Sequence, residues 1–182
     1  MYRRALAEGE VDKTEKFYPG WQYDAFIKNI HEILDNLPNY FPNYKGQGYE
    51  IAGFAWWQGH KDSGNQEWVD GYEKNLVNLI QDLRAEFKAP KAPFVIATVG
   101  FGGKGMGGNF LKIWEAQMAF GDPARHPDFA GNVLTVDTRD FWRSVEQSPN
   151  GQGYHYNGNA GTYMLVGDAL GRGMVELLEG KK

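Results

Sequence analysis

Three continuous apolar runs stand out along the chain, and each of them is followed by a helix-like pattern. The runs carry almost no charge and span residues 49–57 (YEIAGFAWW), 94–100 (FVIATVG) and 132–138 (NVLTVDT). Short runs rich in aromatic and β-branched residues are typical of strands that are covered on both faces, as in parallel sheets. The sequence therefore predicts three buried parallel strands.

The remaining segments show apolar residues at every third or fourth position. This helical spacing occurs at residues 23–36, 67–87, 109–120 and 157–179. Pro38 is expected to end the first helix and to open a loop up to residue 48, because proline removes a helix hydrogen bond. The last helix is expected to turn five residues toward the core and to use its glycines for close approach to the sheet. These five are Tyr163, Val166, Leu170, Met174 and Leu177.

Alternation of strands and helices predicts an α/β fold with right-handed crossovers and helices on both faces of a parallel sheet. We expect residues 1–48 to form a helical and loop lead-in segment and residues 49–182 to form the α/β part. Ligands of such folds bind beyond the carboxyl ends of the strands. Three polar or glycine-rich stretches fall there: WWQGHKD at 56–62, GFGGKGMGG at 100–108 and DTRDFWR at 137–143.

The composition excludes several classes of function but does not indicate a particular one. A net charge of −4 gives no reason to expect a nucleic-acid partner, and the absence of cysteine excludes disulfides and a thiol nucleophile. No apolar stretch reaches the ~18–20 residues of a membrane span. Residues 1–16 lack the apolar core of a signal peptide, so the sequence assigns no compartment.

The glycine-rich loop raises one rival reading, a dinucleotide-binding fingerprint. Gly100, Gly102 and Gly105 match GxGxxG between a predicted strand and a predicted helix. However, the loop continues through two further glycines, and no acidic residue caps the next strand at the right distance, since Asp122 falls in a loop. A flexible loop at the sheet edge is the favoured interpretation, and dinucleotide binding is the less favoured alternative.

Other candidate centres are weaker. His60 with Asp62 and His126 with Asp128 lack a third ligand at usable spacing, so neither a metal nor a cofactor is predicted. The chain has three serines, and none of them lies in a GxSxG turn. The sequence therefore offers no recognisable nucleophile.

Two segments together carry a resemblance to a known family. WWQG at residues 56–59 ends the first strand, and GQGYHYNGNA at 151–160 places His155 before the final helix. This order resembles the SGNH hydrolases, in particular the sialate O-acetylesterase-like carbohydrate esterases, over residues 49–178. The resemblance implies a three-layer flavodoxin-like parallel sheet and hydrolysis of acetyl esters on carbohydrate.

The resemblance also implies roles for single residues. Gln58 corresponds to the donor of an oxyanion hole, and His155 corresponds to the base that accepts the proton of the nucleophile. Trp57, Gly59 and His60 are the candidate substrate-binding residues. Exposed tryptophans such as Trp68 or Trp142 are further candidates for stacking on sugar rings.

Three departures from the family pattern change these expectations. Gln152 stands where the family has the acid of DxxH, so Asp137, with Glu146 behind it, is the nearest candidate for the third triad member. His60 replaces the glutamate of WWQGE. The family's GQSN serine block on a first strand does not occur at all.

We therefore expect a chain that corresponds to the C-terminal part of a longer esterase, lacks the first strands and is inactive alone. A non-catalytic carbohydrate-binding relic of the same fold is the alternative. The expected partner is an acetylated carbohydrate. The unpaired edge of the strand at 49–57 is also expected to favour self-association.

Overall fold

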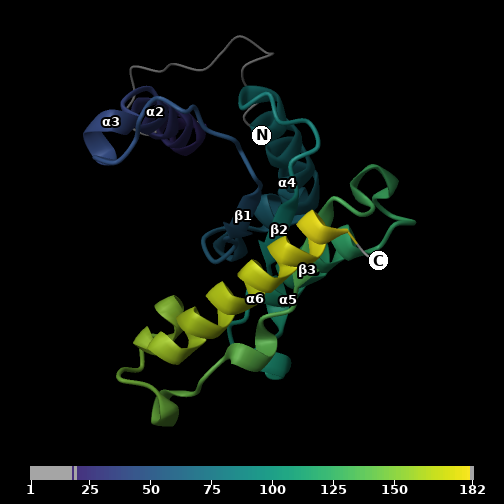
Figure 1. Ribbon diagram of the computed structural model, residues 1–182. Coiled ribbons are helices and arrows are strands. Elements are labelled where there is room, and N and C mark those ends of the chain that lie inside the picture. Colours follow the sequence, from purple (N-terminus) through teal and green to yellow (C-terminus); the bar gives the residue numbers. More distant parts are fainter. Residues whose placement is uncertain (1–17, 19, 181–182) are drawn as a thin grey trace. The chain divides into compact units, whose positions relative to one another are not determined.

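The computed structural model describes residues 18 and 20–180 (Figure 1). The chain divides into two compact units, Met1–Glu50 and Ile51–Lys182. We describe each unit by itself.

The first unit contains helices α2 (Trp21–Asp35) and α3 (Leu37–Tyr40). The first of these confirms the helix expected at 23–36. The expectation that Pro38 opens a loop is wrong, because Pro38 lies in the first turn of α3. A proline is tolerated there, since the N–H groups of a first helical turn have no partner within the helix.

The second unit is built on a parallel sheet of three strands, in the order β1 (Phe54–Trp57), β2 (Phe94–Ala97) and β3 (Val133–Val136). Phe54 pairs with Phe94, which pairs with Val133. All four residues of β2 are buried. The three predicted strands are thus confirmed, although each is shorter than its apolar run.

Three helices complete this unit: α4 (Gln66–Glu86), α5 (Gly108–Met118) and α6 (Ala160–Glu179). Asparagine side chains cap two of them, since Asn65 accepts from the Trp68 backbone N–H and Asn159 accepts from that of Thr162. Among residues 51–180, seven short 3-10 helices lie in the connections: Asp62–Gly64, Gly103–Gly105, Ala119–Gly121, Pro127–Phe129, Arg139–Phe141, Val145–Gln147 and Tyr154–Gly158.

The helices cover the two faces of the sheet, which gives the predicted three layers (Figure 1). On one face, a Cβ atom added to Gly173 of α6 would lie 3.0 Å from side-chain atoms of Val95 and Leu134. On the other face, Thr135 donates to the Gln117 carbonyl of α5 at 3.0 Å, and α5 packs against α4. Successive side chains of a strand point to opposite faces, so α6 and the pair α4–α5 lie on opposite sides of the sheet.

Helix α6 presents to the sheet the face that the periodicity predicts, except at Tyr163: Val166 is buried, and Leu170, Met174 and Leu177 are half-buried. Its buried residues are Thr162, Val166 and Gly173. Tyr163 is 41% exposed, so its assignment to the core is wrong. The reason is that α6 packs over β2 and β3. A row of apolar side chains therefore stays uncovered among the described residues: Met164, Val175 and Leu178.

Strand β1 lies at an edge of the sheet. Among residues 51–180 no other strand pairs with its free side. Ala55 is exposed, whereas its register partner Val95 on β2 is fully buried. The edge required for self-association is thus present, and the self-association itself stays a prediction.

Candidate functional site

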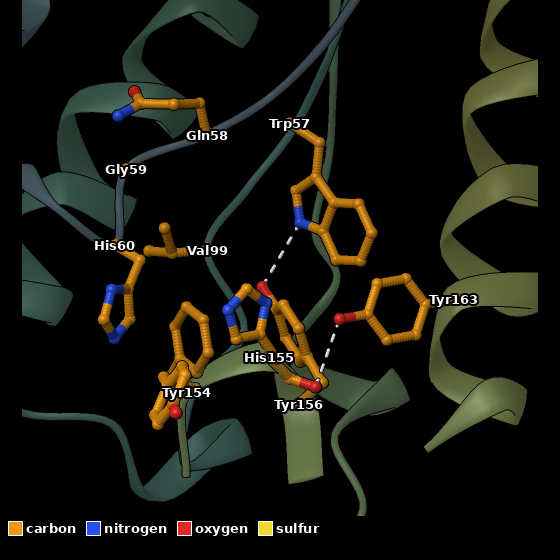
Figure 2. Close-up of a pocket in the computed structure, with 10 residues that line it drawn as sticks. Trp57, Gln58, Gly59, His60, Val99, Tyr154, His155, Tyr156 and Tyr163 are labelled. Carbon is orange, nitrogen blue, oxygen red and sulfur yellow. Dashed lines mark hydrogen bonds between the residues drawn. The ribbon is translucent and has the colours of Figure 1, made fainter. Parts of the chain in front are cut away.

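A cavity of about 210 Å³ opens where β1 and β2 end (Figure 2). This is the edge of the sheet at which parallel α/β folds bind ligands. The lining comes from the ends of both strands, from the segment before α6 and from α6 itself. It consists of Trp57, Gln58, Gly59, His60, Val99, Phe101, Tyr154, His155, Tyr156 and Tyr163.

The chain turns sharply after β1 at Gly59. The φ angle of this residue is 142°, a backbone conformation that favours glycine. A Cβ atom there would lie 2.7 Å from Val99 Cγ1 and 2.9 Å from Ile113 Cγ2. Gly59 therefore shapes the cavity by allowing the chain to pass close to β2 and α5.

Gln58 is held by hydrogen bonds on both its side chain and its backbone. Its Nε2 donates to Asp62 at 2.5 Å, and Tyr72 donates to its Oε1 at 3.2 Å. Its backbone carbonyl accepts from Tyr72 at 2.9 Å and from Gln117 Nε2 at 2.7 Å. In Figure 2 the Gln58 amide points away from His155. One N–H of the amide is thus committed to Asp62.

His60 stands at the mouth of the cavity among aromatic rings. Its ring centroid lies 4.9 Å from that of Phe101 and 6.3 Å from that of Tyr154. Partial burial lowers the pKa of His60, and electrostatic repulsion from His155 and Lys61 lowers it further. The neutral imidazole is therefore favoured, which suits a hydrogen-bonding contact with an uncharged ligand.

His155 lies in a left-handed turn that the sequence pattern does not indicate. Residues His155, Tyr156 and Asn157 have φ angles of 52°, 50° and 55°. A left-handed conformation costs roughly 1–2 kcal/mol per non-glycine residue, and it persists only where the surroundings hold it. Asn157, which is fully buried, accepts from the Gly153 backbone N–H at 2.7 Å and donates to the Arg143 carbonyl at 3.1 Å.

The expected start of the last helix at residue 157 is therefore wrong by three residues, since α6 begins at Ala160. The left-handed turn at residues 155–157 comes before it, and its His155 and Tyr156 line the cavity (Figure 2). Strained backbone of this kind concentrates at functional sites.

The candidate acid Asp137 is not among the residues that line the cavity. Its carboxylate is bound by Arg139, with Nη2 to Oδ2 at 2.7 Å, and by Trp114 Nε1 at 3.2 Å. Burial alone would raise the pKa of Asp137, but the hydrogen bonds and charge of Arg139 and the bond from Trp114 hold it below its usual range. Among the described residues, no carboxylate hydrogen-bonds the His155 ring, whose ring contact is with Tyr154 at 4.8 Å. The structure brings His155, Gln58 and the substrate-binding candidates together, and it leaves Asp137 with Arg139.

Several lining residues escaped the sequence reasoning. Tyr156 receives a hydrogen bond from Trp57 Nε1 at 3.2 Å, and its ring lies 4.9 Å from that of Trp57. Tyr163 packs against Trp57 at 5.4 Å and donates to the His155 carbonyl at 3.1 Å (Figure 2). The available signal was the pair of tyrosines that flank His155 in GYHYN. Trp142, a stacking candidate, lies nearby, with its ring 6.0 Å from that of Tyr156.

The glycines of the loop after β2 have packing partners. A Cβ atom at Gly100 would lie 2.8 Å from Thr138 Oγ1, and one at Gly103 would lie 3.3 Å from the Arg139 carbonyl oxygen. These glycines allow the loop to approach the segment after β3. Close packing thus accounts for part of the GxGxxG match without a dinucleotide.

The other histidine candidate belongs to a packed cluster. His126 Nε2 lies 2.8 Å from Glu73 Oε1, and its ring stacks on Phe120 with a centroid distance of 4.4 Å. Within residues 18 and 20–180, no three His, Cys, Asp or Glu side chains are grouped so as to hold a metal ion. In the same residues, no helix is long and apolar enough to cross a membrane.

The cavity also lacks a hydroxyl or thiol of the usual nucleophilic kind. None of its ten lining residues is serine, threonine or cysteine. The nearest serine in sequence, Ser63, donates its hydroxyl to the His60 carbonyl at 2.7 Å. The described cavity therefore contains two imidazoles, an amide and aromatic rings, and no serine, threonine or cysteine.

Comparisons with known proteins show the family to which the chain belongs. No curated protein matches the chain. The X-ray structure of a protein from Arabidopsis thaliana matches with a TM-score of 0.57 and 21% identity, covering 85% of this chain and 52% of the plant protein. The chain thus shares the fold of that structure and spans about half its length. The model of the family described as carbohydrate esterase, sialic acid-specific acetylesterase matches residues 8–161. This match extends over most of the sequence, from before α2 into the start of α6, so the chain belongs to the sialic acid-specific acetylesterase family of carbohydrate esterases.

Proposed function

We propose that the cavity binds an O-acetylated carbohydrate, with His155 facing the ester as a base and Gln58 as an oxyanion donor. The observation that carries the proposal is the assembly of the β1 end and the His155 turn, distant in sequence, around one cavity. Family membership supports an esterase-type ligand.

The chemistry of the lining fits such a ligand. Aromatic rings from Trp57, Phe101 and Tyr154 offer apolar surface to the acetyl methyl group and the C–H face of a sugar. A neutral amide such as Gln58 can stabilise an oxyanion without titrating, and the loss of one such donor commonly costs ~10²–10³ in rate. An imidazole such as His155 can accept the proton of an attacking hydroxyl.

Acyl transfer by this mechanism also needs a nucleophile. Because the lining contains no serine, threonine or cysteine, we propose that this chain by itself binds the acetylated sugar without hydrolysing it. A serine supplied from outside the described cavity would complete the machinery of a carbohydrate O-acetylesterase.

Calorimetry with matched ligands tests the proposal. Acetylated xylan or sialic-acid fragments should bind, and their deacetylated counterparts should bind at least several-fold more weakly. His155→Ala should reduce the affinity for the acetylated ligand, whereas His126→Ala, which lies in the same unit but outside the cavity lining, should leave it unchanged. An aryl acetate should be hydrolysed no faster than in buffer.

Each result has a clear reading. The absence of heat with acetylated ligands would refute the proposed binding. Turnover of the aryl acetate by the unchanged chain, lost in His155→Ala, would show that a nucleophile is present and that binding without hydrolysis is wrong. Quenching of tryptophan fluorescence by NAD without binding of sugars would favour the dinucleotide alternative.

A further inference from the structure

The phenol oxygen of Tyr156 accepts two hydrogen bonds from the framework of the site. Trp57 Nε1 donates to it from the end of β1 at 3.2 Å, and the Gly100 backbone N–H donates from the loop after β2, also at 3.2 Å. The residue is 6% exposed and lines the cavity. Its oxygen thus joins two neighbouring strand ends.

A phenol group can accept two hydrogen bonds and donate one. Both acceptor positions of Tyr156 are taken, so its own hydrogen must be donated elsewhere. Among residues 18 and 20–180, no hydrogen bond has Tyr156 as the donor. Burial raises the pKa of Tyr156 to about 12, despite the opposing bonds from Gly100 and Trp57. The hydrogen therefore remains on the oxygen at neutral pH.

The ring itself is held rigidly. It stacks on Phe101 with a centroid distance of 4.3 Å and an interplanar angle of 23°, and it lies 4.9 Å from Trp57. The left-handed backbone of the turn sets its direction. A donor that is already in place before the ligand binds is the kind that stabilises developing charge effectively, because nothing has to reorganise. The two bonds that the oxygen accepts also polarise its O–H group.

We infer that the Tyr156 hydroxyl donates a hydrogen bond to the carbonyl oxygen of the bound acetyl group. This inference rests on the proposed function. It makes the Tyr156 hydroxyl the group that recognises the ester carbonyl, which a deacetylated sugar lacks. It gives Tyr156 a donor role that is separate from that of Gln58, whose amide has one N–H committed to Asp62.

Tyr163 provides the matched control. It also lines the cavity, but its hydroxyl already donates to the His155 carbonyl at 3.1 Å. Its hydrogen is therefore not available to a ligand. Both tyrosines contact Trp57 (Figure 2), so the two phenylalanine variants remove the same atom from neighbouring rings.

The test uses an acetylated saccharide fragment with ¹³C at the ester carbonyl and records its infrared stretch on the full chain. A hydrogen bond lowers this frequency, so the bound carbonyl should absorb below the free ligand. Tyr156→Phe should return the frequency toward the free value and weaken binding roughly tenfold. Tyr163→Phe should shift the frequency of the bound carbonyl much less than Tyr156→Phe, because the Tyr163 hydrogen is already donated to the His155 carbonyl.

Tyr156→Phe also leaves the N–H groups of Trp57 and Gly100 without their acceptor, and the variant could fail to fold. Incorporation of 3-fluorotyrosine at position 156 avoids this, because it keeps the oxygen and makes the hydroxyl more acidic. The carbonyl frequency should then fall further. An unchanged frequency with fluorotyrosine would overturn the role of Tyr156 and leave the proposed function intact. Absence of binding to the unchanged chain would overturn both.

Discussion

Two glycines of α6 allow the effect of close helix–sheet packing on the free energy of unfolding to be measured. Gly173 is buried against the sheet, and its added Cβ atom would lie 3.0 Å from Leu134 Cδ2 and 3.0 Å from Val95 Cγ1. Gly167 lies in the same helix with no atom within 4 Å of the corresponding position. Gly173→Ala and Gly167→Ala are therefore a matched pair that differ in packing alone.

The expected magnitudes follow from two opposing effects. Alanine is favoured over glycine in a helix interior by about 1 kcal/mol, and this gain applies to both variants. Apolar carbons pack best at about 3.5–4.0 Å, so the new methyl at 173 is about half an ångström too close. Val95 is fully buried and β-branched, which leaves it little freedom to move. Such overpacking costs about 1–3 kcal/mol.

Gly167→Ala should therefore raise the free energy of unfolding by about 1 kcal/mol. Gly173→Ala should be neutral or should lower it by up to about 2 kcal/mol, so the two variants should differ by about 1–3 kcal/mol. Urea unfolding followed by circular dichroism measures this difference, provided that the denaturant slope is the same in both. Equal stabilisation of the two variants would refute the idea that Gly173 is required for the approach of α6 to the sheet.

Two further predictions concern the mouth of the cavity and the sheet edge. His155→Gln should raise the pKa of His60 while burial keeps it below 6.5, because the charge of His155 is one cause of the lowered value. Because the pKa of His60 is lower in the folded chain than in the unfolded chain, the unfolded chain binds more protons at pH values between the folded pKa and 6.5. The free energy of unfolding therefore decreases as the pH drops through this window. This decrease should be smaller in the His155→Gln variant. An NMR titration of the His60 ring that shows no change would mean that the two imidazoles do not interact. The purified chain should also self-associate through β1 and the uncovered side of α6, and Met164→Glu, at a side chain that is 75% exposed, should lower the mass seen by light scattering. A monodisperse monomer of the unchanged chain would contradict this.

The sequence alone determined the elements of the α/β part. The runs at 49–57, 94–100 and 132–138 each contain one strand of the parallel sheet, and the periodicity at 67–87 corresponds to α4. This was possible because continuous apolar runs and a 3.6-residue repeat are local properties of a chain. The family also followed from short local motifs, WWQG and the histidine-bearing loop.

The tertiary structure decided how these elements meet. The strands that α6 covers are set by the folded sheet, and periodicity could not choose β2 and β3 over β1. The left-handed turn at His155 is held by contacts of Asn157 with Gly153 and Arg143, so no local propensity predicts it. In the same way, the sequence made Asp137 a candidate for the third triad member, whereas in the folded chain its carboxylate is bound by Arg139.

The sequence alone also could not predict all of the residues that line the cavity. Gln58 and His155 were found because they belong to recognisable motifs, whereas Tyr156 became a candidate only through its bonds to Trp57 and Gly100. Those three residues come from the ends of two strands and from the segment before the last helix. Both hydrogen bonds that the Tyr156 oxygen accepts come from distant parts of the chain, and the folded arrangement alone specifies those partners.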